Sequence, residues 1–341
     1  MREGWAGLGA VISKGMLFGL PGLASAALLT SPNPASRAIE KYQTLFAECQ
    51  APGSGGRLIV LRSFVQGGQP LLFAVDPETL TTRMLAAKGL RPHRLSWAKL
   101  RKTIADTPYG RAMADSEKSA AARQDAGIVH SLPPNKGVVL TIDLCPSLRP
   151  LDRSLFTAIL TNFAPEEKPV PLGIAITGRW MVEHPADLAW LRKLDQDREI
   201  VVTWINHSFN HRYGPGLPLS QNFLLEPGTD LAFEVLRTEA AMIDNGLQPS
   251  VFFRFPGLVS DARLVDRVTS YGLIPVGSDA WLAKGQTPTS GSIVLVHGNG
   301  NEPIGIEKFL ELVRSEGPAI REKHWLLFDL RESVSREEEK R

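Results

Sequence analysis

The part of the chain after residue 137 alternates apolar runs with amphipathic segments, and this pattern constrains the fold more than any other feature. Apolar strands separated by helical periods are typical of a parallel sheet covered by helices. The units are too many for a small open sheet, so we predict an α/β fold with a closed or nearly closed β/α barrel. The β-rich runs are GVVLTIDL, VPLGIAITG, EIVVTWIN, SVFFRFPG, LIPVGSDAW, SIVLVHGN and WLLFDL.

The first residues have the features of a secretory signal peptide. A basic start precedes the apolar run 15–30, which contains a small-residue site ending at Ala26. A membrane anchor is the alternative, but the run is short and is interrupted by Gly19 and Pro21. We therefore predict that residues 1–26 are removed and that the mature protein is periplasmic or secreted, with no stable membrane span.

Residues 27–134 form a second region, which we predict to be a small α+β unit of unknown role. An amphipathic helix is expected around 35–49, and two β-like runs separated by QGGQ indicate a hairpin within 57–75. Polar helical sequence follows. The barrel is then expected over 135–331, with a charged tail at 332–341.

Composition limits the function only weakly. Of the 341 residues, 43% are hydrophobic and 22% charged, which is typical of a globular protein. The net charge of +2 gives no electrostatic indication of a nucleic-acid partner, and we expect none. The two cysteines, Cys49 and Cys145, could form a disulfide in an oxidising compartment or stay as buried thiols.

Polar residues lie at the carboxyl ends of several predicted strands. Because parallel strands of a β/α barrel end at one rim, these side chains should meet there. Histidines four residues apart can bind one metal ion if the backbone between them turns helical. A single polar residue at a strand end is usually a cap, but several at successive ends indicate a site. They are Asp143, His207, His211, Arg254, Asp279, Trp281 and His297.

Five segments carry a resemblance to a known family. TIDLCP, NHSFNH, FRFPG, SDAW and LVH occur in the order of the five motifs of NodB-type polysaccharide deacetylases, carbohydrate esterase family 4. The resemblance covers roughly residues 137–330. It implies a distorted (β/α) barrel that uses a divalent metal to remove N-acetyl, less often O-acetyl, groups from a polysaccharide or oligosaccharide. Zinc is the expected metal, and cobalt, nickel or manganese are alternatives.

The resemblance also implies a role for each matching residue. Asp143 matches the catalytic base, Arg254 the residue that keeps it ionised, and His297 the acid that protonates the leaving nitrogen. His207 and His211 match two metal ligands. The remaining matches are Pro256 and Gly257 at an oxyanion-binding turn, Trp281 in the wall over the acetyl group, and Asp279 close to it.

Two positions depart from the family pattern. Leu144 stands where the family has a second aspartate that binds the metal, and Ala280 stands where an aspartate precedes the tryptophan. Asp279, one residue earlier, is a candidate to replace the latter. An altered metal shell with fewer ligands should bind zinc more weakly.

Three functions remain open at this point. The first is an active exported deacetylase with an altered metal shell. The second is a barrel that binds glycan without hydrolysing it, although the matches at Asp143, Arg254 and His297 favour catalysis. The third is a hydrolase that uses Cys145 with a histidine. A serine hydrolase is disfavoured because the sequence has no G-x-S-x-G.

Overall fold

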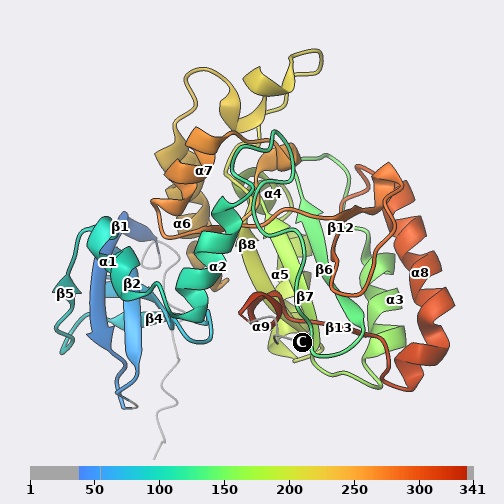
Figure 1. Cartoon of the computed structure of the whole chain (residues 1–341), viewed down its shortest axis with the longest axis horizontal. Helices are drawn as coiled ribbons and strands as arrows, with labels where there is room; N and C mark the ends of the chain where they lie inside the picture. The colour runs from blue at the N-terminus through green and yellow to red at the C-terminus, as the bar shows by residue number, and fades with distance from the viewer. Residues whose placement is uncertain (1–37, 54, 336–341) are drawn as a thin grey trace, which may run out of the picture. The chain divides into compact units, whose positions relative to one another are not determined.

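The computed structural model describes residues 38–53 and 55–335 (Figure 1). The predicted signal peptide, residues 1–26, and residues 336–341 of the predicted tail lie outside this part of the chain. Among the described residues, none of the helices combines the length and the apolar character needed to cross a membrane.

The first described elements form an antiparallel sheet with the strand order β4-β3-β2-β1-β5. The predicted hairpin is present: β2 pairs with β3 across Gly67 and Gly68, whose positive φ values suit a tight two-residue turn. Two helices, α1 and α2, follow the sheet. The bounds are β1 Ile39–Gln50, β2 Arg57–Gln66, β3 Gln69–Val75, β4 Thr82–Ala86, β5 His93–Arg94, α1 Trp97–Thr103 and α2 Pro108–Glu117.

The helix predicted around 35–49 is wrong, because residues 39–50 form strand β1. The pairing of β1 with β2 has two register shifts, and the extra residues move the apolar side chains out of strict alternation. Ile39, Tyr42 and Phe46, which contact one hydrophobic cluster, are therefore three and four residues apart, which is the spacing of a helical face.

The rest of the chain forms the parallel sheet that the apolar runs predict. Its strand order is β10-β9-β8-β7-β6-β12-β11, and β13 pairs with β6 beside this path. The two end strands, β10 and β11, do not pair, so the sheet is curled but open and the predicted distorted barrel is confirmed. The bounds are β6 Gly137–Leu144, β7 Val170–Ile176, β8 Ile200–Asn206, β9 Pro249–Phe253, β10 Ile274–Pro275, β11 Ala280–Trp281, β12 Ile293–His297 and β13 Leu326–Leu327.

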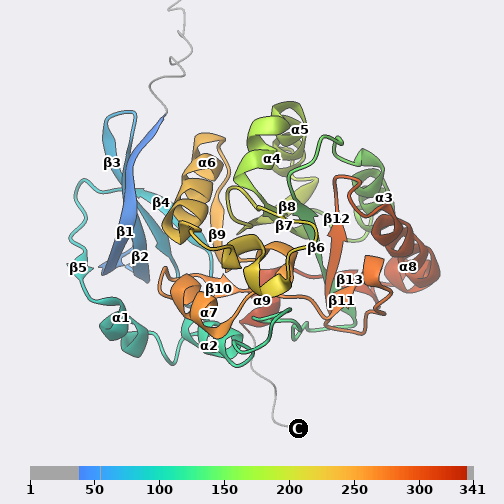
Figure 2. The same ribbon diagram turned by 90° about the horizontal axis from the view of Figure 1, so that it is seen from above.

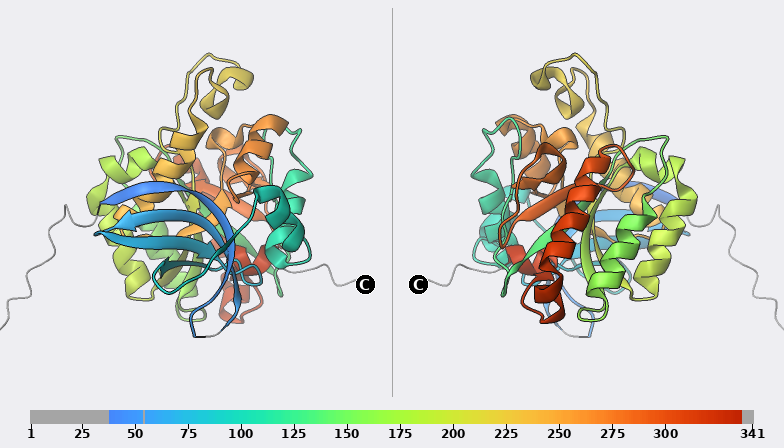
Figure 3. Two further views of the ribbon diagram at one scale, coloured as in Figure 1. Left: turned by 90° about the vertical axis from the view of Figure 1, so that its left-hand side faces the viewer. Right: turned by 90° about the vertical axis from the view of Figure 1, so that its right-hand side faces the viewer.

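Helices cover one face of this sheet, and α3 and α8 lie side by side over it (Figures 2 and 3). Several begin at a side-chain cap, such as Asp152 before α3 and Asp261 before α7. The bounds are α3 Arg153–Phe163, α4 Gly178–Glu183, α5 Pro185–Gln196, the π-helix η4 Phe233–Arg237, α6 Thr238–Asp244, the 3₁₀ turn η5 Pro256–Leu258, α7 Ala262–Thr269, α8 Pro303–Arg321 and α9 Leu330–Val334.

The inner face of the parallel sheet shares a hydrophobic cluster with the antiparallel sheet. Val139 and Ile205 of the inner face belong to the same cluster as Ile59 and Phe73 of β2 and β3. A second cluster fills the space between the outer face and the helices. Successive residues of a strand alternate between these two clusters, and this alternation decides which side chains reach the site.

Candidate active site

Strand β6 delivers the carboxylate at the centre of the site. Val138, Leu140, Ile142 and Leu144 belong to the outer cluster, so the residues between them face the inside of the curled sheet. Asp143 is one of these inward residues and is buried. Strand β12 lies next to β6 in a register that pairs His297 with Asp143.

Arg254 holds the Asp143 carboxylate. The guanidinium is fully buried, and its Nη1 donates to Asp143 Oδ1 at 2.8 Å and to Thr141 Oγ1 at 2.7 Å. Nη2 donates to the carbonyl of Gly277 at 2.9 Å. Burial alone would raise the pKa of Asp143, but Arg254 outweighs it, with help from the imidazoles of His207 and His297, and the pKa falls below its ordinary value. Asp143 is therefore an ionised proton acceptor.

His207 follows β8, and one hydrogen bond orients its ring. Nδ1 lies 2.9 Å from the carbonyl oxygen of Arg254, which can only accept, so Nδ1 carries a hydrogen. In the neutral ring the lone pair is therefore on Nε2. This atom is 3.6 Å from Cys145 Sγ and 3.6 Å from Asp143 Oδ2. The ring is thus fixed in the tautomer that a metal ligand needs.

His211 lies beside His207 although the backbone between them does not make the helical turn that usually brings two histidines at this spacing together. The backbone instead takes positive φ at Ser208 (67°) and His211 (47°), and the two ring centroids are 4.8 Å apart. Glu234 of η4 fixes this loop, because its carboxylate accepts from the backbone N–H groups of Phe209 and Asn210 at 2.8 Å. His211 Nε2 is buried and has no hydrogen-bond partner among the described residues.

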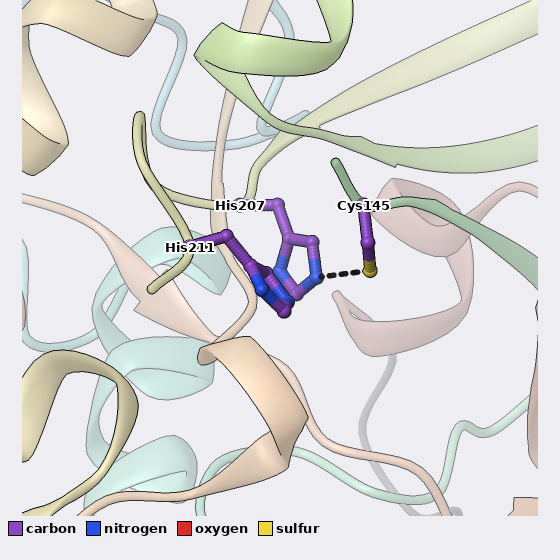
Figure 4. A group of neighbouring side chains, drawn as sticks. All are labelled: Cys145, His207 and His211. Carbon is purple, nitrogen blue, oxygen red and sulfur yellow. Dashed lines mark hydrogen bonds between the residues drawn. The ribbon is translucent and has the colours of Figure 1, made fainter. Parts of the chain in front are cut away.

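Cys145, His207 and His211 form one cluster, with their ligand atoms all within 4.8 Å of one another (Figure 4). Two imidazoles and a thiol are a donor set that suits zinc. The buried Nε2 of His211, which has no hydrogen-bond partner among the described residues, would gain a partner by binding the ion. Cys145 is two residues after Asp143 and lies with it at the site, whereas Leu144 lies in the outer cluster. Cys49 and Cys145 are both free, so the disulfide alternative is not realised.

The imidazoles also change the acidity of the thiol. Burial would raise the pKa of Cys145, but the charges of His211 and His297 and the contact with His207 hold it well below its ordinary value. The sulfur is therefore available as a thiolate, the form that binds metal ions.

His297 lies between this cluster and a carboxylate that the sequence analysis missed. Its Nδ1 is 2.9 Å from Glu302 Oε2, and the ring centroid of Trp281 is 5.9 Å away. The direction of the 2.9 Å contact departs from that of a linear hydrogen bond, and Nδ1 has no other partner in the described part of the chain. Burial lowers the pKa of His297, but the neighbouring Cys145, Glu302 and Asp143 raise it well above its ordinary value.

Three other predicted site residues, Asp279, Pro256 and Gly257, take a less direct part in the site. Asp279 does not join the group: its carboxylate contacts His130 Nδ1 at 2.7 Å and accepts from the N–H of Ile293, at the amino end of β12. The Pro256–Gly257 turn packs on the ring of Phe223, whose centroid is 5.6 Å from that of His211. Gly257 has φ +60°, and a Cβ there would lie 2.5 Å from Phe223 Cζ.

The sequence contained a signal for the two roles that were missed, that of Cys145 as a metal ligand and that of Glu302 beside His297. Strand alternation places residue 145 on the side of residue 143, which identifies Cys145 as a ligand candidate in place of Leu144. Glu302 is five residues past His297, after a glycine-rich turn that brings the chain back to the same rim.

No family model matches the sequence. Similar solved structures include a family 4 carbohydrate esterase from Bacillus anthracis, with 17% identity and a TM-score of 0.46 over 65% of this chain and 92% of that one. A family 4 carbohydrate esterase from Streptomyces lividans in complex with acetate has 19% identity and a TM-score of 0.38, covering 57% and 92%. A CE4 family pseudoenzyme from Bacillus anthracis has 16% identity and a TM-score of 0.42, covering 61% and 68%. These proteins belong to the family that the motifs resemble, and a likeness at these values assigns no activity to this chain.

Proposed function

We propose that this chain is an exported, metal-dependent hydrolase that removes acetyl groups from a polysaccharide. One observation carries the proposal: the ionised Asp143 lies 3.6 Å from the ring nitrogen of His207 that belongs to the Cys145–His207–His211 cluster. A carboxylate base beside three metal-binding side chains is an arrangement for activating water.

Cys145, His207 and His211 would hold the ion. Three protein ligands leave a fourth tetrahedral position open, as in catalytic zinc sites. A thiolate favours zinc or cobalt over magnesium or calcium. When bound, the ion lowers the pKa of water and polarises the acetyl carbonyl.

The other residues divide the proton transfers. Asp143, kept ionised by Arg254, takes a proton from the attacking water. His297, on the neighbouring strand, gives a proton to the departing nitrogen or oxygen. Trp281, beside His297, limits the space available to the acyl group. The saccharide substrate and the N-acetyl preference rest on the motif resemblance, and export rests on the sequence of residues 1–26.

The test combines metal analysis with acetate release from acetylated oligosaccharides such as N-acetylglucosamine oligomers. We expect one zinc per chain in the purified protein and loss of acetate release after chelation. Cys145→Ser should weaken zinc binding by at least about 100-fold, since even changes outside the ligand set of a metal cost ~10–100-fold. Cys49→Ser is the matched control, because Cys49 is the other buried free cysteine. Equal metal content in both variants would refute the assignment of Cys145.

The contact of Cys145 Sγ with His207 Nε2 favours a second candidate, a thiol hydrolase that forms an acyl-enzyme on Cys145. Such an enzyme would keep its activity in chelator and lose it to iodoacetamide. A metal-binding protein that releases no acetate but binds the oligomers would instead be a glycan-binding barrel.

A further inference from the structure

The turn between β12 and α8 brings a carboxylate back onto the His297 ring. Glu302 is the residue before the first turn of α8, and its side chain makes no hydrogen bond to cap that helix. It points instead to His297, with Oε2 at 2.9 Å from Nδ1. The carboxylate of Glu302 is therefore directed to the site and not to the N-terminus of α8.

A hydrogen bond from Trp281 fixes this carboxylate in place. The indole Nε1 of Trp281 donates to the same Glu302 oxygen at 2.7 Å. Lys284 Nζ lies 3.6 Å from the centroid of the Trp281 ring. Glu302 therefore connects two strands of the sheet, because Trp281 ends β11 and His297 ends β12.

We propose that Glu302 is the positioning residue for the acid His297. By holding Nδ1, Glu302 leaves Nε2, on the other side of the ring, as the nitrogen that serves the reaction. This inference rests on the proposed function. It names a residue outside the motifs that suggested that function.

In the proposed hydrolysis, Nε2 of His297 is the atom that donates a proton to the leaving group. The oxygen of water bonds to the acyl carbon while Asp143 takes one of its protons. The bond from the acyl carbon to the leaving nitrogen then breaks as His297 gives the Nε2 proton to that nitrogen. The products are acetate and the free amine. An amine cannot leave without this proton, whereas a phenolate with a low pKa can.

Asp279, the carboxylate that the sequence analysis places near Trp281, does not contact His297. It contacts His130 and the first residue of β12, while His297 is the last residue of that strand. Among the acidic residues described near Trp281, Glu302 is the one that contacts His297.

The test compares two substrates in Glu302→Gln. Hydrolysis of an N-acetylated glucosamine oligomer depends on the acid, so we expect its kcat to fall about 10–100-fold, a part of the usual contribution of a general acid. Hydrolysis of 4-nitrophenyl acetate, whose leaving group needs no proton, should fall less than about 3-fold. Trp281→Phe should act in the same direction but less strongly. Glu307→Gln, on the exposed side of α8, is the matched control.

A readout that needs no activity accompanies the kinetics. Long-range ¹H–¹⁵N spectra of the histidine rings should show both ring nitrogens of His297 protonated in the unmodified protein, as its role as an acid requires, and a changed Nδ1 resonance in Glu302→Gln. Equal kinetic losses on both substrates, or an unchanged His297 spectrum, would overturn the inference. Failure of the proposed function has a different result, an unmodified protein inactive on both substrates. The spectrum alone then decides whether Glu302 positions the ring.

Discussion

Placing an aspartate at residue 144 should damage the protein rather than complete the proposed metal site. The family that the motifs resemble has an aspartate at this position, so Leu144→Asp would be the obvious repair. Leu144, however, is fully buried in the cluster between the sheet and the helices, and its Cδ2 lies close to the backbone of Gly298. A carboxylate there would face Ile142 and Leu151, away from His207.

The loss in free energy of unfolding that we expect for Leu144→Asp is the sum of two contributions. Removing a buried leucine side chain costs about 2–5 kcal/mol. An unpaired polar or charged group in the same space costs at least about 2 kcal/mol more, even if the carboxyl becomes protonated. The sum of roughly 4–7 kcal/mol is comparable to the whole stability of many domains, about 5–15 kcal/mol. Leu144→Met, which conserves volume, should cost less than about 1.5 kcal/mol.

Urea unfolding followed by tryptophan fluorescence measures these differences, and zinc titration measures the site. Cys145→Asp is the informative partner, because it puts the carboxylate on the face that contacts His207. We expect Cys145→Asp to stay folded and to bind zinc more tightly than Cys145→Ser. A stable Leu144→Asp variant with tighter zinc binding would refute the argument from strand alternation.

Three further predictions concern the scaffold. Arg62 and Glu239 form a fully buried bidentate ion pair, so Arg62→Met should cost about 3–5 kcal/mol in urea unfolding, and adding Glu239→Gln should recover part of it. No recovery in the double variant would contradict the pairing. Burial raises the pKa of Glu167 to about 7, so the folded state loses stability as pH rises from 4.5 through 7. Glu167→Gln should therefore gain about 2–3 kcal/mol over the parent at pH 8.5 and little at pH 4.5, and an equal gain at both would contradict this. Gly257→Ala should lose about 1–3 kcal/mol, because its φ is positive and the new Cβ meets the Phe223 ring; an unchanged urea midpoint would argue against this.

The parallel sheet could be predicted from the sequence because its strands are buried on both faces. Such strands are continuous apolar runs, and β6 was predicted with its observed bounds, 137–144. Strand β1 could not be predicted in this way. Its register shifts depend on pairing with β2, which local spacing does not reveal.

The site was predictable where strand ends supplied its residues. Asp143, His207, Arg254 and His297 follow from that rule and lie together. His211 lies with them by a route that the sequence did not suggest, through positive φ values rather than a helical turn.

The two departures from the family pattern lie beside residues that could compensate for them. Leu144 removes a carboxylate, and Cys145 places a thiol 3.6 Å from His207. Ala280 likewise stands in place of a second carboxylate, and the carboxylate of Glu302 lies 2.9 Å from His297. Chance loss of ligands in a barrel that only binds glycan would not be expected to leave replacements at both places. Paired replacement therefore supports the proposed hydrolysis, with a different ligand set, over glycan binding alone.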